Sequence, residues 1–229
     1  MMLHPPAIDE SLAIDTLCRL AADPSQAKAL HDVIGDFCHI IRNRLNTLQI
    51  GLYLAKSHSP ATCPKVWEEL ASHSREAERR IALFQTVCRP MTLRPITIGL
   101  DLVLNEFVNR WAPRFLARGV SLESPGLAIH EPSRIDPSRI GEGLDAVASW
   151  RLSEAKPGGT IQMHARAMKG WSRIEWSEPL ATEEPKRGGL PLAVFAKVAF
   201  AHGGGLTRET RDGLRLTIEW PHREPASPA

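Results

Sequence analysis

The chain has 229 residues, of which 43% are hydrophobic and 24% are charged, and its formal net charge is +2. This length allows one or two domains with a buried core, and the composition is that of an ordinary globular protein. Because 28 basic residues are balanced by 26 acidic ones, nothing in the charge predicts binding to nucleic acid or to anionic lipid.

The longest apolar stretch, residues 191–201, is too short and too interrupted to span a bilayer. The first residues lack the basic and apolar regions of an export signal. No cysteine has a second cysteine or a histidine nearby at the spacing of a zinc site, so we expect reduced thiols. We therefore expect a cytoplasmic protein that binds no membrane and no metal of its own.

The first 90 residues predict a long helical hairpin. Residues 1–26 contain one short amphipathic helix and a break. In 27–56, apolar residues recur every three or four positions, which predicts a helix with one apolar stripe. Residues 57–64 form a turn rich in proline and small polar residues. A second helix follows, whose seam has the spacing of a coiled coil: Leu70, Ser74, Ala77, Ile81, Phe84 and Cys88.

Two helices with one apolar seam each cannot bury those seams by themselves. We therefore expect residues 27–90 to form a homodimeric four-helix bundle. The alternative is that the hairpin folds back on the C-terminal domain of its own chain.

Residues 96–222 have a different rhythm, in which short strands alternate with helices. Helices are predicted over 98–119, with an interruption at Pro113, over 136–156, and within 188–205. Alternating strands are predicted within 158–179 and over 213–220, and shorter ones over 120–124 and 127–130. This pattern predicts an α/β sandwich, so the fold class of the whole chain is α+β. Residues 223–229 read as a disordered tail.

His39 lies on an unusual face of the first long helix. Each residue turns a helix by about 100°, which places Asp36, Arg42, Asn43 and Asn46 on the same side as His39 and the apolar stripe on the other. A histidine there packs against nothing. It is either idle or reached by a partner.

Three stretches resemble two-component histidine kinases. The stretch around His39 resembles the phosphoacceptor box of that family, with Arg42, Leu45 and Asn46 at the matching positions. Residues 135–166 resemble the helix of the ATP domain that leads into a Pro-Gly-Gly turn and a strand. Residues 188–206 resemble its Gly-Leu-Gly-Leu segment. The resemblance covers about residues 27–220 in the same order, and it implies a dimerisation and phosphotransfer hairpin followed by a kinase-ATPase-like domain.

The nucleotide-binding elements of that family are altered here. Active kinases carry on the ATP-domain helix an asparagine that holds Mg²⁺ and phosphates, and Ser149, Trp150 or Arg151 stands at that place. The Asp-x-Gly-x-Gly loop should follow a strand ending at Trp176, but neither its aspartate nor its glycines are present. The lid is nearly absent, and Pro191 replaces the second glycine of the Gly-Leu segment. We therefore expect no ATP binding and no resident cofactor.

The resemblance then implies a histidine phosphotransferase of a two-component phosphorelay. His39 would accept a phosphoryl group from the aspartate of a response-regulator receiver domain and pass it on, while the receiver supplies Mg²⁺. A neutral imidazole suffices for this attack, which fits Ile40 at a position that is usually acidic in kinases. Asp36 would hold one ring nitrogen, Arg42 would meet phosphate oxygens, and both would form the docking surface with Asn43 and Asn46.

Two other functions remain open at this point. One is an active sensor-type histidine kinase, which would have to bind ATP despite the altered elements. The other is a non-catalytic pseudokinase scaffold that binds a kinase or receiver while His39 stays chemically silent. The neighbours of His39 would then simply be a solvated helix face.

Overall fold

The structure of the chain is a computed structural model. It describes residues 15–16, 18–19, 23, 26, 41–43, 45–54, 64–125, 132–168, 170–179 and 189–221. The chain divides into two compact units, the first made of Asp23–Pro90 and the second of Met91–Ala229 with Met1–Ala22. We call them the hairpin unit and the sheet unit.

The hairpin unit is helical wherever it forms a described element. Residues 41–43 and 45–54 are helical, and they are followed by α3, Pro64–Cys88. The predicted second helix is thereby confirmed, while much of the predicted first helix lies outside the described residues. Helix α3 ends before Pro90. The Arg89 N–H still donates to the Gln85 carbonyl at 2.8 Å, but Pro90 has no N–H to donate.

The sheet unit is built on strands in the order β2-β4-β5-β7-β6. Strand β2 is parallel to β4, and the remaining neighbours are antiparallel. A separate small sheet pairs β1 with β3 antiparallel. The strands are β1 Ile96–Ile98, β2 Ser121–Glu123, β3 Ser133–Ile135, β4 Thr160–Met168, β5 Trp171–Glu178, β6 Gly205–Glu209 and β7 Leu214–Pro221.

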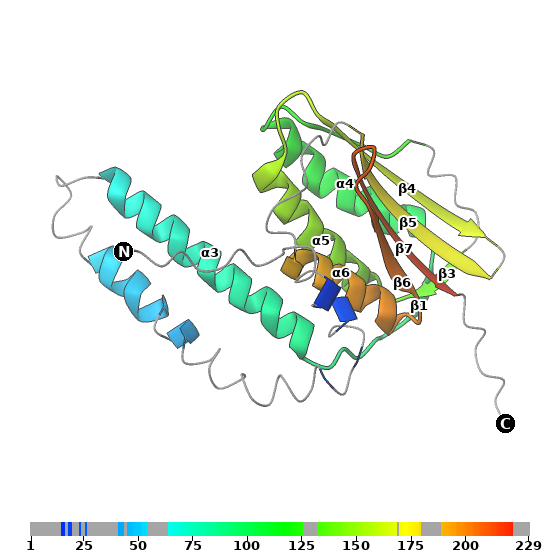
Figure 1. The fold of residues 1–229 in the computed structure, drawn as a ribbon, viewed down its shortest axis with the longest axis horizontal. Coiled ribbons are helices and arrows are strands. Elements are labelled where there is room, and N and C mark those ends of the chain that lie inside the picture. Colours follow the sequence, from blue (N-terminus) through cyan, green and yellow to red (C-terminus); the bar gives the residue numbers. More distant parts are fainter. Residues whose placement is uncertain are drawn as a thin grey trace. The chain divides into compact units, whose positions relative to one another are not determined.

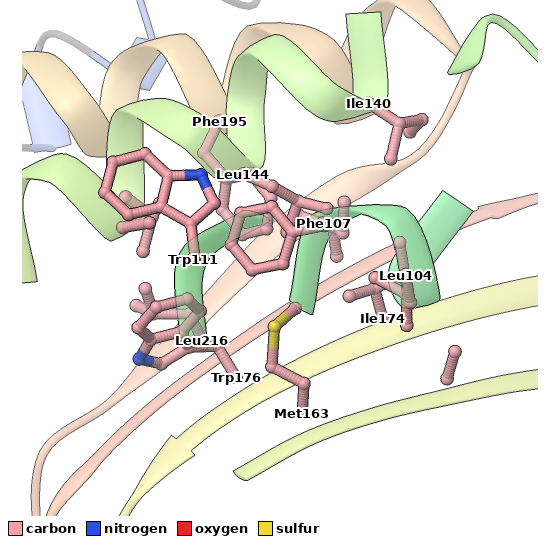
Figure 2. Packing of buried hydrophobic residues seen from close by; sticks show 14 of the residues in the cluster. Leu104, Phe107, Trp111, Ile140, Leu144, Met163, Ile174, Trp176, Phe195 and Leu216 are labelled. Atoms are coloured by element: carbon pink, nitrogen blue, oxygen red, sulfur yellow. The ribbon is translucent and has the colours of Figure 1, made fainter. Parts of the chain in front are cut away.

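Helices α4 (Leu100–Leu116), α5 (Pro137–Glu154) and α6 (Gly189–Ala201) cover one face of the larger sheet (Figure 1). Alternate residues of β5 and β7 face these helices and are buried, which is the period-2 pattern of a half-covered sheet. Figure 2 shows the resulting core, where Phe107 and Trp111 of α4 lie over Trp176 of β5. The Phe107 and Trp176 rings are 6.4 Å apart, nearly edge to face. The predicted α+β class and α/β sandwich are confirmed.

Local signals set the start of α5 as predicted. Asp136 caps the helix, since its Oδ1 accepts the Arg139 N–H at 3.1 Å, and Pro137 occupies the first turn. The interruption predicted at Pro113 is wrong, because α4 runs through it to Leu116. Pro113 lies in the last turn of α4, where its missing N–H removes only one helical hydrogen bond.

Some short elements were not predicted. Strands β1, β3 and β6 have three to five residues each and little alternation of apolar residues. The strand predicted over 127–130 and the tail at 223–229 lie outside the described residues. None of the helices in the described part of the chain combines the length and the apolarity needed to cross a membrane.

Candidate functional site

The predicted phosphotransfer face is described only in part. His39 and Asp36 lie outside the described residues. Arg42, Asn43 and Asn46 all lie on one helical segment, where their spacing of three and four residues makes them neighbours on its surface. Asn43 and Asn46 are exposed, whereas Arg42 is half-buried.

Arg42 is half-buried because it reaches across to the second helix of the hairpin. Its Nη2 donates to Oε1 of Gln85 on α3, with 2.5 Å between the two atoms. Sequence reasoning missed Gln85, since nothing in a single sequence shows which residue of α3 stands opposite Arg42. Among the described residues, no carboxylate lies within ion-pair distance of Arg42.

Two other arginines of the hairpin differ from Arg42 in that they pair with a carboxylate. Arg79 and Arg80 both pair with Glu76, at 2.8 and 2.9 Å. Burial alone would raise the pKa of Glu76, but the hydrogen bonds and charges of Arg80 and Arg79 lower it. The carboxylate of Glu76 therefore offsets charge at Arg79 and Arg80, while the amide of Gln85 offsets none at Arg42.

In the sheet unit, a buried ion pair joins α5 to β5. Arg151 of α5 donates from Nε and Nη2 to the two carboxylate oxygens of Glu178 at the end of β5, each at 2.7 Å. Arg151 is 5% exposed and Glu178 is 6% exposed. This two-point geometry is the strongest form of an arginine–carboxylate contact.

Neighbouring side chains complete the contacts of both charges. Trp176 donates its indole N–H to Glu178 Oε1 at 2.7 Å, and Glu154 accepts from Nη1 of Arg151 at 2.9 Å. The Arg151 guanidinium also lies 4.9 Å from the ring centre of the buried Trp150, a cation–π distance. The charges and polar atoms of this cluster are thus paired within the protein itself.

The cluster includes residues that the resemblance to histidine kinases aligned with a nucleotide-binding position. Two of the three residues that can stand at the place of the metal-binding asparagine, Trp150 and Arg151, are buried, and Arg151 is paired. The carboxylate of Glu178 is taken up by internal donors. Among the described residues, no group of three or more histidine, cysteine, aspartate or glutamate side chains could hold a metal ion.

Sequence reasoning missed the pairing of Arg151 with Glu178. It ended the strand at Trp176, whereas β5 continues to Glu178. The signal was present, because Ile174, Trp176 and Glu178 continue the same alternation and so place a carboxylate on the buried face. A charged residue at such a position requires a buried partner.

A second buried polar cluster lies at the other end of α5. His202 follows α6 and is 6% exposed. Its Nε2 accepts the Asp136 N–H at 3.0 Å, and its Nδ1 lies 2.7 Å from the Val198 carbonyl, to which it donates in that tautomer. Burial lowers the pKa of His202, and the Val198 carbonyl and the Asp136 charge offset this only in part. His202 is therefore a helix-end residue that links α6 to the start of α5.

Comparison with known proteins gives a structural likeness without a sequence relative. No family model matches the chain, and no curated protein matches it. Among solved structures, the histidine kinase AdeS of Acinetobacter baumannii matches with a TM-score of 0.60 and 13% identity, over 79% of this chain and 96% of AdeS. The fold is that of a histidine kinase.

Two further kinases support this likeness. ThkA, solved in complex with the response regulator TrrA, matches with a TM-score of 0.63 and 15% identity over 86% of this chain. Full-length ShkA in complex with AMPPNP matches with a TM-score of 0.58 and 18% identity, again over 86% of this chain. The match spans 64% of the ThkA chain and 47% of the ShkA chain. These matches agree with a helical segment followed by an α/β sandwich like a histidine kinase catalytic domain.

Proposed function

We propose that the chain is a histidine phosphotransferase of a two-component phosphorelay that works without ATP. His39 accepts a phosphoryl group from a receiver-domain aspartate and passes it to another receiver. The fold supports a place in this class of signalling protein, since ThkA, which shares it, was solved with a response regulator bound. The proposal retains a cytoplasmic location, a hairpin domain at 27–90, and a kinase-ATPase-like domain at 96–222.

The observation that carries the absence of ATP is the ion pair of Arg151 with Glu178. In this proposal the pair takes the place of bound nucleotide and metal by supplying each buried charge with a partner from the chain. Opening the site to ATP would require separating the two, and loss of one partner of a buried pair costs about 3–5 kcal/mol. ShkA, which has a similar fold, was solved with AMPPNP bound, so the proposal rests on these residues and not on the fold.

The phosphotransfer step uses the imidazole of His39 as nucleophile. A ring nitrogen attacks phosphorus, the bond between phosphorus and the aspartyl oxygen breaks, and the receiver regains its carboxylate. Mg²⁺ bound to the receiver stabilises the transferring group. Asp36 holds the other ring nitrogen, and Arg42 donates to phosphoryl oxygens. Asn43 and Asn46, which are exposed, extend the docking surface on the receiver side.

The proposed active form is a homodimer joined through the hairpin. Large apolar side chains of the hairpin are exposed in the single chain: Leu48 59%, Ile50 61%, Tyr53 74%, Leu54 50% and Leu70 43%. Isolated exposed apolar residues are ordinary, but a group of this size on one helical hairpin is typical of an interface. A four-helix bundle would bury part of this surface.

Two parallel labelling reactions test the proposed function. The purified chain is incubated either with a ³²P-phosphorylated receiver or with Mg²⁺ and γ-³²P-ATP. We expect acid-labile, alkali-stable label from the receiver only. His39→Gln should abolish that label, whereas His164→Gln, on the sheet unit, should keep it.

Each of the other outcomes would assign a different function or a different phosphoacceptor to the chain. Label from ATP would mean an active kinase. Binding of the receiver without label would mean a scaffold. Label that survives His39→Gln would place the phosphoacceptor elsewhere.

A further inference from the structure

We propose that Gln85 is a positioning residue for phosphoryl transfer: its side-chain oxygen orients the Arg42 guanidinium and leaves the positive charge available. This inference rests on the proposed function, since it concerns the same step at His39. It assigns a role to a residue of α3, which is not part of the predicted phosphoacceptor box.

The geometry fixes one end of Arg42. The hydrogen bond from Arg42 Nη2 to Gln85 Oε1 joins residues 43 positions apart and is partly buried. A guanidinium has five N–H donors in a rigid plane. One bond to Gln85 therefore restricts the orientation of the whole plane and leaves other donors for a ligand.

The choice of an amide at residue 85 matters for charge. A glutamate there would pair with Arg42 as Glu76 pairs with Arg79 and Arg80. It would make a stronger contact and would neutralise the guanidinium. Gln85 supplies the same oxygen without the negative charge, so Arg42 is oriented but still able to attract an anion.

The position of Arg42 connects this pair to the chemistry. Arg42 follows His39 by three residues in the sequence, and the proposed function assigns its guanidinium to the phosphoryl oxygens. The group that arrives at His39 carries negative charge on its phosphoryl oxygens. A charged donor that is already oriented stabilises these oxygens more strongly in an interface that excludes water.

Two variants of Gln85 test the assignment. Gln85→Ala removes the orienting oxygen, and Gln85→Glu keeps it but neutralises Arg42. We expect each to lower the rate constant of transfer from a phosphorylated receiver about tenfold, the scale of one misplaced or weakened ionic contact. The thermal midpoint of Gln85→Glu should stay at or above that of the wild type. The matched control is Gln162→Glu on β4 of the sheet unit, which should transfer at the wild-type rate.

A double-mutant cycle separates positioning from packing. If Gln85 acts through Arg42, Gln85→Ala should cause no further loss in the Arg42→Ala background. A full tenfold loss in that background would overturn the assignment. So would a wild-type rate for Gln85→Glu, because a residue that only packs the two helices together would tolerate the stronger contact.

The outcome also separates this inference from the proposed function. If the wild type takes label on His39 and both Gln85 variants take it at the same rate, only the role of Gln85 is refuted. A wild-type chain that takes no label from any phosphorylated receiver refutes the phosphotransferase function, and the role of Gln85 with it.

Discussion

Arg151 and Glu178 join α5 to the end of β5 through two hydrogen bonds of 2.7 Å between nearly buried side chains. The residues are 27 positions apart in the sequence. Each of these two buried charges therefore has its partner within the sheet unit.

Removing one partner should destabilise the sheet unit strongly. Glu178→Leu leaves the Arg151 charge buried and without its main partner, which should lower the free energy of unfolding by about 3–5 kcal/mol. Replacing both residues, as Arg151→Met with Glu178→Leu, should recover most of that loss. Urea unfolding followed by tryptophan fluorescence measures both. Glu219→Gln is the control, because its pair with Arg173 is exposed and should contribute less than about 1 kcal/mol. Equal effects of Glu178→Leu and Glu219→Gln would contradict this view.

Two glycines of α5 should respond oppositely to alanine. A Cβ on Gly143 would lie 3.0 Å from Phe195 and 3.2 Å from Val198 of α6, whereas a Cβ on Gly141 would meet nothing within 4 Å. Gly143→Ala forces α5 and α6 apart and should destabilise by about 1–3 kcal/mol. Gly141→Ala should stabilise by about 0.5–1 kcal/mol, since alanine favours a helix. Thermal unfolding of both variants decides the matter, and a stabilising Gly143→Ala would show that the helices are not in close contact.

Stability should fall in mild acid because of His202. Its pKa in the folded state is lowered from the ordinary value of 6.5, chiefly by burial. Below that value the unfolded chain binds a proton that the folded chain resists, so the free energy of unfolding decreases as the pH falls, by at most about 1.4 kcal/mol per pH unit. Above the ordinary pKa, His202 is neutral in both states and adds no further pH dependence to the free energy of unfolding.

A neutral replacement isolates this effect. Glutamine at residue 202 can still accept from Asp136 and donate to Val198, but it does not titrate in this range. The difference in unfolding free energy between wild type and His202→Gln should shift against the wild type from pH 7 to pH 5. Parallel curves for the two proteins would show that His202 is not the titrating group.

The exposed apolar residues of the hairpin should govern self-association. Leu48→Glu together with Tyr53→Glu places charges on side chains that are 59% and 74% exposed in the single chain. If a second copy covers them, the mass from light scattering should fall from dimer to monomer, with helical content nearly unchanged. As a control, Leu116→Glu, at an equally exposed residue of α4, should leave the mass as it is. A dimer that survives the double change would place the interface elsewhere.

Local signals allowed much of the fold to be predicted. Asp136 and Pro137 mark the start of α5, Pro90 marks the end of α3, and alternation marks β5 and β7. Strands β1 and β3 were missed because they are short and pair with each other across a long stretch of sequence. Strand β6 pairs with the neighbouring β7, and it was missed because it is short and has little alternation of apolar residues. The effect of Pro113 was predicted wrongly, because a proline in the last turn of a helix removes only one backbone hydrogen bond and the helix can continue past it.

The site was less predictable than the fold. The face with Arg42, Asn43 and Asn46 follows from helical periodicity, since it needs only one helix. Gln85 opposite Arg42, and Glu178 opposite Arg151, depend on how two elements meet across the interior. Gln85 and Glu178 are ordinary polar residues that no motif in the sequence singles out. Only the continued alternation of β5 through Glu178 gave any sign of a buried charge.

The most direct test of phosphotransfer without ATP is to locate the phosphate on the chain. The protein is mixed with a receiver phosphorylated by a small-molecule donor, with ATP absent, and digested under alkaline conditions for phosphopeptide mapping by mass spectrometry. We predict phosphohistidine at His39 within the peptide that contains Arg42. A chain that gains phosphate only when Mg²⁺ and ATP are supplied, or that carries it at another residue, would contradict the proposed function.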